Sequence, residues 1–298
     1  MDRLEAMSIL VAAVESGSFS AAGRRLGAPL PTVSRKVSEL EARLGARLLV
    51  RSTRKLTLTD AGEAYVAACR RILEEVAEAE RAAAGEYAAP RGELVVTAPI
   101  AFGRLHVLPV VIECLARYPE IDVRLTLSDR NVDLIDAHID VAVRIGALAD
   151  SGLVATRVGF VRRVVCASPD FIARHGEPKA PSDLTGLACI GFEGLGAGGW
   201  TFEASGARAA PAVKPRLTVT TAEAAIDAAT AGVGVTRVLS YQAAEAVAAG
   251  TLTIVLASFE PAPLPVQLVH AGQGLLPQKT RAFLDLATER LRGALRAA

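Results

Sequence analysis

The stretch from Ser18 to Gly45, SFSAAGRRLGAPLPTVSRKVSELEARLG, most constrains what this chain can fold into. It predicts a short helix that Ser18 or Ser20 can cap, a turn containing Gly27, and a second helix. Pro31 is compatible with the first turn of the second helix, where no amide donor is needed. Two short helices joined by a tight turn form a helix-turn-helix.

The second helix has two faces of different chemistry. At about 100° per residue, its apolar residues fall in one sector of roughly 60°: Val33, Val37, Leu40 and Leu44. A separate sector carries hydroxyl and charged side chains: Thr32, Arg35, Lys36, Glu39 and Arg43. Arginine can bond a guanine edge in the major groove, while Ser, Thr and Lys hold phosphates. An ordinary helical hairpin with a solvated polar face is the alternative interpretation.

Positive charge is concentrated around this motif. Residues 20–59 contain nine Lys or Arg and two acidic residues, a net charge of +7, whereas the whole chain carries +1 and the remainder therefore −6. A basic segment on a slightly acidic body predicts a polyanionic partner for that segment. A solvated basic surface would show the same imbalance.

The segment after the second helix predicts a basic hairpin. LLVRSTRKLTLTDAG, residues 48–62, has two β-prone runs with Arg51, Arg54 and Lys55 at the tip. Basic residues on such a wing can reach a neighbouring minor groove or its phosphates.

A long helix is predicted after the wing. Thr59 and the D-x-x-E pattern from Asp60 mark its start, and we expect it to run to about Glu86. Its apolar residues recur at steps of three and four and predict a second copy of the helix as partner: Val66, Cys69, Leu73 and Val76. Two-fold protein symmetry in turn predicts a palindromic DNA site.

The remaining two hundred residues alternate strands and helices. AAPRGEL, residues 88–94, predicts a linker. The runs after it, LVVTAP, FGRLHVLPVVIECLARY, IDVRLTLS, NVDLIDAHI and DVAVRIG, predict a βαβαβ unit with a parallel sheet, its first helix interrupted near Pro109. A last strand, PVQLVHA, and a helix, QKTRAFLDLATERLRGAL, close the chain.

The sequence also indicates the cellular compartment and whether the chain binds a metal. No uncharged apolar run reaches about 18 residues, and MDRLEAMSIL lacks a signal-peptide pattern, so we expect a cytoplasmic protein without a membrane segment. The four cysteines and four histidines are scattered without metal-ligand spacing. We therefore expect no metal site, and reduced, mostly buried thiols.

Two motifs, ESGSFSAAGRRLG and TVSRKVSELEARLGARLLVRSTRKLTLTDAG, together with the long helix after them, resemble the LysR-type transcriptional regulators. The resemblance covers essentially the whole chain. It implies an α/β fold class with an N-terminal all-α winged helix-turn-helix head, a long linker helix and a two-lobed α/β effector domain similar to periplasmic binding proteins. The implied domains are residues 1–59 for the DNA-binding head, 60–87 for the linker and dimerisation helix, and 88–298 for the effector domain. Lobe I would span about 92–164 and 267–298, and lobe II about 165–266.

The resemblance also implies contacts and partners. The implied DNA contacts are Ser20, Pro31, Thr32, Ser34, Arg35, Lys36, Arg51 and Arg54. Pro29-Leu30-Pro31 stands where many members carry polar residues, which shifts the expected specificity onto Arg35 and Lys36 or onto DNA shape. The implied partners are double-stranded DNA, other copies of the chain in a homodimer or homotetramer, a small-molecule effector and RNA polymerase. No cofactor is expected.

Ligands of open α/β sheets bind beyond the carboxyl ends of the strands, near helix N-termini. This rule, applied to the two lobes, predicts effector contacts at Thr97, Ala98, Pro99, Ile100, Phe102, Ser128, Arg144, Thr220, Thr221 and Thr236. Arg144 would pair with a ligand carboxylate, or alternatively with Asp129 or Asp140. Ile100 and Ala101 stand where many relatives place Ser or Thr, which weakens the case for a small, highly polar anion.

Two other classes of function are alternatives to a regulator. A solute-binding protein would use the lobes but would need an export signal. An enzyme would need a nucleophile–base pair or a carboxylate dyad, and neither stands out. Gly194, Gly196 and Gly199 match G-x-G-x-x-G, yet Trp200-Thr201-Phe202 follows and predicts a hairpin loop instead of the helix of a dinucleotide site. We therefore expect a regulator and not an enzyme.

Overall fold

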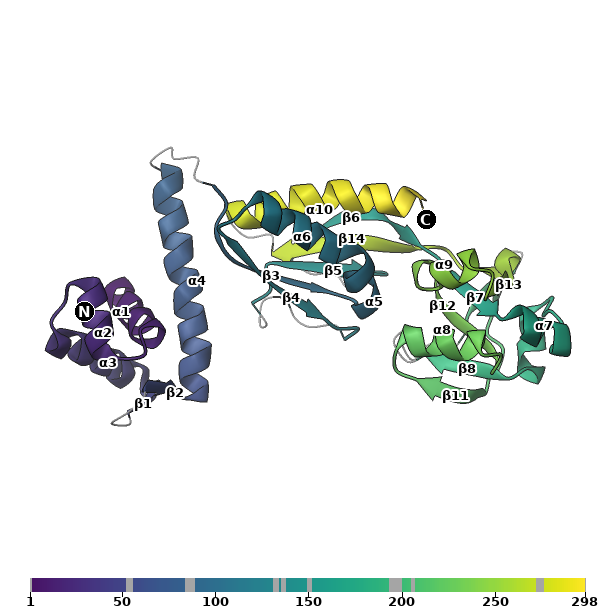
Figure 1. Ribbon diagram of the computed structural model, residues 1–298, viewed down its shortest axis with the longest axis horizontal. Helices are drawn as coiled ribbons and strands as arrows, with labels where there is room; N and C mark the ends of the chain where they lie inside the picture. Colours follow the sequence, from purple (N-terminus) through teal and green to yellow (C-terminus); the bar gives the residue numbers. More distant parts are fainter. Residues whose placement is uncertain are drawn as a thin grey trace. The chain divides into compact units, whose positions relative to one another are not determined.

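The computed structural model describes residues 2–51, 56–83, 89–130, 134, 138–148, 152–192, 200–204, 207–271 and 276–297. The chain divides into two compact units, residues 1–88 and 89–298 (Figure 1). No helix within the described ranges is both long enough and apolar enough to cross a membrane.

The first unit is a helical head with a two-stranded wing, as the sequence predicts. Its elements are α1 (Arg3–Glu15), α2 (Phe19–Leu26), α3 (Leu30–Leu44), β1 (Leu49–Arg51), β2 (Leu56–Leu58) and α4 (Asp60–Ala83). β1 and β2 pair antiparallel, with Val50 opposite Thr57. The tip of the wing and the GLGAGG segment, residues 52–55 and 194–199, lie outside the described residues.

Local hydrogen bonds fix the ends of these helices. Ser18, and not Ser20, caps α2, because its Oγ accepts from the amide of Ala21 at 3.1 Å. Gly27 ends α2 at a φ of 64°, in the left-handed region that favours glycine. Thr59 caps α4, because its Oγ1 accepts from the amide of Gly62 at 2.9 Å and donates to the carbonyl of Arg47 at 2.7 Å.

More residues of α4 are buried in the core of the head than the sequence predicts. Val33, Val37 and Leu40 are buried there as predicted, whereas Leu44 is 41% exposed. Val66 and Cys69, predicted to face a second copy of the chain, are instead buried in the same core as α1 residues such as Leu10. The head therefore covers the first part of the stripe itself, whereas Leu73 and Val76, further along α4, are half-buried.

The second unit contains two lobes. Lobe I is built on a five-stranded sheet of order β4-β3-β5-β14-β6. Its strands are β3 (Gly92–Ala98), β4 (Ile121–Leu127), β5 (Val141–Ile145), β6 (Leu153–Val161) and β14 (Leu264–Ala271). The helices α5 (Ile100–Phe102), α6 (Leu108–Arg117) and α10 (Gln278–Ala297) accompany this sheet (Figure 1).

The predicted parallel sheet is found in lobe I only for the first three strands. β3 pairs parallel with β4 and β5, but β14 pairs antiparallel with both β5 and β6, so the sheet is mixed. The helix expected over NVDLIDAHI falls mostly on residues outside the described ranges.

The interruption predicted near Pro109 is a change of helix type. A π-helical turn, Gly103–Val107, joins α5 to α6, and Pro109 lies in the first turn of α6. Because proline has no amide to donate, the backbone leaves regular α geometry just before it.

Lobe II has a second five-stranded sheet of order β11-β8-β12-β7-β13. The strands are β7 (Arg163–Ala167), β8 (Cys189–Phe192), β11 (Pro215–Val219), β12 (Val235–Leu239) and β13 (Thr253–Val255). A small hairpin, β9 (Phe202–Ala204) and β10 (Ala207–Ala209), and the helices α7 (Pro169–His175), α8 (Ala222–Thr230) and α9 (Ser240–Ala248) complete the lobe.

All four cysteines are buried free thiols. Burial raises the pKa of each thiol, to about 12 for Cys166 and about 11 for Cys189. Their reduced, buried state agrees with the scattered spacing in the sequence.

One buried carboxylate joins α3 to the wing. Glu41 is 7% exposed, and its Oε1 accepts from the amides of Leu48 at 2.8 Å and Leu49 at 3.1 Å. We expect Glu41→Ala to lower the free energy of unfolding by about 2–3 kcal/mol, because two buried amides lose their acceptor. Urea denaturation followed by circular dichroism measures this loss. Glu75→Ala, at an exposed position of α4, is the matched control, and equal stabilities of the two variants would contradict the assignment.

Candidate nucleic-acid interface and effector lobes

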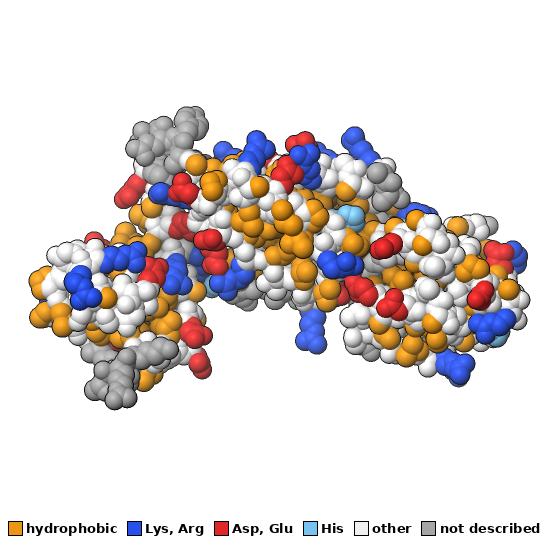
Figure 2. All heavy atoms as spheres, in the orientation of Figure 1, with side chains coloured by type: hydrophobic (Ala, Val, Ile, Leu, Met, Phe, Trp, Pro, Cys, Tyr) orange, Lys and Arg blue, Asp and Glu red, His pale blue; other side chains and the backbone are white. Residues whose placement is uncertain are grey.

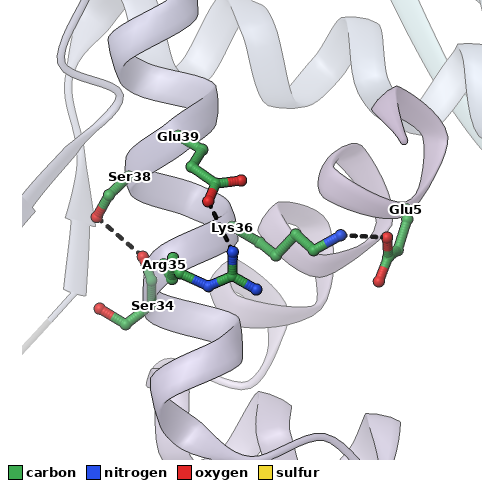
Figure 3. A network of polar contacts seen from close by, with 6 residues as sticks. All are labelled: Glu5, Ser34, Arg35, Lys36, Ser38 and Glu39. Atoms are coloured by element: carbon green, nitrogen blue, oxygen red, sulfur yellow. Dashed lines mark hydrogen bonds and ion pairs between the residues drawn. The ribbon is translucent and has the colours of Figure 1, made fainter. Parts of the chain in front are cut away.

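The outward face of α3 presents the exposed cation Arg35. Its side chain is 64% exposed, and its Nη1 lies 2.9 Å from Oε1 of Glu39, one turn further along the helix (Figure 3). In this orientation, with the cation nearer the helix N-terminus, an i,i+4 pair adds little helix stability. The pair instead holds the guanidinium in a defined direction on the exposed face.

The helical wheel predicts Lys36 on the outward face of α3 with Arg35, but the structure places it elsewhere. Its side chain is only 15% exposed, and its Nζ contacts Oε2 of Glu5 on α1 (Figure 3). Lys36 therefore joins α3 to α1 within the head, and in this structure it does not extend into solvent beside Arg35. No sequence pattern indicates this contact, because the two residues are 31 positions apart.

The other predicted DNA contacts have mixed exposure. Ser20 and Pro31 are exposed, and Thr32 and Ser34 are half-buried. The carbonyl of Ser34 accepts from Oγ of Ser38 at 2.9 Å (Figure 3). Arg51 is the last residue of β1, and Arg54 lies outside the described residues. Lys and Arg side chains are visible on the face of the head in the space-filling view (Figure 2).

The first turn of α3 is apolar. Pro29 occupies the N-cap position without a side-chain cap, and its carbonyl accepts from the amides of Thr32 and Val33 at 2.9 and 3.2 Å. Leu30 is 47% exposed there. The Pro29-Leu30-Pro31 segment thus gives the first turn of α3 an aliphatic, partly exposed surface.

In lobe I the predicted ligand position at the start of α5 is occupied by the chain's own carboxylate. The Oδ1 of Asp129 accepts from the amide of Ile100 at 3.0 Å. The sequence indicated Asp129 only as a candidate partner of Arg144. Because a helix N-terminus attracts negative charge, this carboxylate replaces the anion that the strand-end rule would place there.

Two of the predicted effector contacts have structural roles in this state. Thr97 and Thr236 are fully buried. Their Oγ1 atoms donate to main-chain carbonyls, Thr97 to Thr126 at 3.0 Å and Thr236 to Ile190 at 3.3 Å. Ala98 and Phe102 are also fully buried.

The remaining candidates are nearer the surface. Pro99, Ile100 and Thr221 are half-buried, and Thr220 is exposed. Thr221 caps α8, since its Oγ1 accepts from the amide of Ala224 at 3.3 Å, and Ser128 Oγ accepts from the amide of Arg130 at 3.2 Å.

Arg144 is more buried than a surface ligand residue would be. It is 8% exposed, and desolvation by burial lowers its pKa. Asp129 and Asp140 were the alternative partners predicted for Arg144. Both carboxylates accept hydrogen bonds from main-chain amides, Asp129 from Ile100 at 3.0 Å and Asp140 from Val95 at 2.8 Å.

The two lobes meet at an aromatic contact. Tyr241, at the start of α9 in lobe II, is buried in the core of lobe I. Its ring lies edge-on to Phe102 at 5.2 Å between centroids and 5.6 Å from His106. Burial raises the pKa of the Tyr241 hydroxyl and lowers the pKa of His106, so both side chains are neutral near pH 7.

Known proteins share both parts of this arrangement. Residues 4–63 match the bacterial regulatory helix-turn-helix family of lysR type, and residues 88–292 match the LysR substrate binding domain. An HTH-type transcriptional regulator of Xanthomonas campestris is 39% identical over 289 residues, which cover 95% of this chain and 84% of that protein.

Solved structures agree in architecture. CrgA, a LysR-type transcriptional regulator from Neisseria meningitidis, superposes with a TM-score of 0.62 at 33% identity, covering 96% of this chain and 98% of that one. The Vibrio cholerae virulence activator AphB superposes with a TM-score of 0.63 at 26% identity, covering 97% and 99%.

The two ion pairs of α3 should differ in a double-mutant cycle. We expect the cycle of Glu5→Ala and Lys36→Ala to give a coupling of about 0.5–1 kcal/mol in the free energy of unfolding, because Lys36 is largely shielded from solvent. The cycle of Arg35→Ala and Glu39→Ala should give about 0.3 kcal/mol or less. A zero coupling between Glu5 and Lys36 would remove the structural role given to Lys36.

Proposed function

This chain belongs to the LysR family of DNA-binding transcriptional regulators, and on that premise we propose that its head reads a palindromic promoter site while its lobes bind a small-molecule effector. The observation that carries the first part is the exposed Arg35 guanidinium, oriented by Glu39 on the outward face of α3. In a helix-turn-helix the second helix enters the major groove, and arginine forms two parallel hydrogen bonds with a guanine edge.

The apolar first turn of α3 suits a different base. Leu30 is 47% exposed and lies next to Pro31, and an aliphatic surface can contact the C5-methyl group of thymine. We therefore propose that the first turn recognises thymine while Arg35 recognises guanine. Arg51, Arg54 and the exposed Ser20 would contact phosphates or the adjacent minor groove.

The effector response would act through the contact between the lobes. A ligand that prefers one arrangement of the lobes shifts the population toward that arrangement. The Phe102–Tyr241 contact joins the two lobes, so a change in their arrangement would alter this contact. Asp129 already supplies a carboxylate at the start of α5, so at that position a neutral or amine-bearing group of the effector is favoured over an anion.

Oligomers would form through α4 and α6. Leu73 and Val76 of α4 are half-buried within the head and can pack against a second α4. On α6, Leu108, Ile112 and Leu115 recur at steps of four and three and are 39%, 59% and 40% exposed. Hydrophobic side chains gather over this part of lobe I in the space-filling view (Figure 2). An exposed apolar stripe of this kind marks a protein contact, here between effector domains of two copies.

Membership of the LysR family also bears on catalysis, compartment and partners. Its relatives are named as transcriptional regulators, and we propose that this chain acts by binding, without catalysis or a cofactor. Action on promoters places it in the cytoplasm, with RNA polymerase as the partner that its DNA-bound form would affect.

Arg35→Ala should weaken binding to the promoter site by about 1–3 kcal/mol, because one bidentate base contact is lost. Fluorescence anisotropy on the DNA upstream of the protein's own gene, repeated across a salt series, measures the effect. Arg216→Ala, an exposed position of lobe II, is the control of the same residue type. Equal weakening on random DNA would assign Arg35 to a phosphate, and no effect at all would remove it from the interface.

Ile112→Asp should reduce the oligomeric state in solution by removing the effector-domain contact while leaving α4 pairing intact. A charged residue in the centre of the stripe would be desolvated on association. Sedimentation velocity measures the change, and Glu120→Asp, an exposed position just after α6, is the control. An unchanged sedimentation coefficient would exclude the α6 stripe as an interface.

A further inference from the structure

Two arginines stand on one face of the lobe II sheet. Arg163 begins β7 opposite Leu239 of β12, and Arg237 of β12 lies opposite Val165 of β7. Side chains alternate along a strand, so both arginines share the face of Val165 and Val235. That face packs against Trp200 and Phe202, at the start of the β9–β10 hairpin.

Arg237 is held firmly on this face. It is 7% exposed, and its Nη1 donates to the carbonyl of Thr201 at 3.2 Å. Its guanidinium carbon lies 5.9 Å from the centre of the Trp200 ring, within the range of a cation–π contact. The guanidinium is therefore ordered before any ligand arrives.

Arg163 is half-buried beside it and has no counter-charge in the described chain. Among the described residues, the ion pairs and hydrogen bonds include none from the Arg163 guanidinium, although its neighbour Arg162 pairs with Glu260 at 3.0 Å. Burial and the positive charge of Arg208 lower the pKa of Arg163, and burial and Arg163 together lower the pKa of Arg237 to about 10. Arg163 is thus close enough to both Arg208 and Arg237 to be repelled by their charges.

Such a cluster of cations costs free energy. A partly buried charge without compensation destabilises the fold, and clustered like charges add to that cost. A bound oxyanion would remove both costs, since arginine binds carboxylate and phosphate groups through two parallel hydrogen bonds.

We propose that Arg163, Arg208 and Arg237 form a binding site in lobe II for a small oxyanion that bears two or more negative charges as carboxylate or phosphate groups. All three residues come from lobe II, so the site goes beyond the effector response proposed above and does not depend on DNA binding. Trp200 borders the site and would report its occupancy.

The test uses the intact protein and its single tryptophan. Trp200 emission is recorded while sodium citrate or inorganic phosphate is added, with sodium chloride at equal ionic strength as the reference, and the melting temperature is followed in parallel. We expect a saturable change of emission and a rise in melting temperature with at least one of the two oxyanions. A response to citrate alone would indicate a carboxylate ligand, and a response to phosphate a phosphorylated one.

Arg163→Gln should weaken that binding at least tenfold. Without ligand the variant should melt at the same temperature as the wild type or higher, because it removes a repulsive charge, so loss of binding is distinguishable from misfolding. Arg216→Gln, exposed on β11, should bind like the wild type. The proposal is overturned if neither oxyanion gives a saturable change, if chloride reproduces it, or if Arg163→Gln binds as tightly as the wild type.

Discussion

The effector domain depends on one strand that arrives late in the chain. β14 lies between β5 and β6 and pairs antiparallel with both, so β6 joins the sheet of lobe I only through β14. All of lobe II is encoded between β6 and β14 and is therefore an insertion into lobe I. The chain crosses between the lobes twice, and Leu239 and Tyr241 of lobe II are buried in the core of lobe I. Any change in the angle between the lobes has to be accommodated at the two crossings and at this buried contact.

Periodicity in the sequence predicts what is decided locally. The apolar positions Val33, Val37 and Leu40, the caps formed by Ser18 and Thr59, and the wing all follow from spacing and turn chemistry, and the structure agrees with them. The order of head, long helix and two lobes is implied by the resemblance to the LysR-type regulators that these motifs carry. The exposed position of Arg35 is likewise readable from the helical wheel, because a single helix decides it.

Contacts between residues far apart in the sequence could not be predicted in the same way. The wheel places Lys36 beside Arg35, but the length of its side chain lets it reach Glu5 on α1. The stripe of α4 predicts a partner without identifying it, and α1 of the same chain covers Val66 and Cys69. An apolar strand has the same composition whether it pairs parallel or antiparallel, so the mixed sheet of lobe I was not evident. Asp129 at the amide of Ile100, and the meeting of Arg163 with Arg237, likewise depend on tertiary packing.

The four buried thiols have a consequence for signalling. They lie in four separate cores, and burial keeps each of them protonated at neutral pH. The thiolate is the form that attacks peroxides and disulfides, and here it is both scarce and enclosed. Oxidants in the cell therefore meet no exposed cysteine thiolate among the described residues, and these thiols can react only where the fold opens.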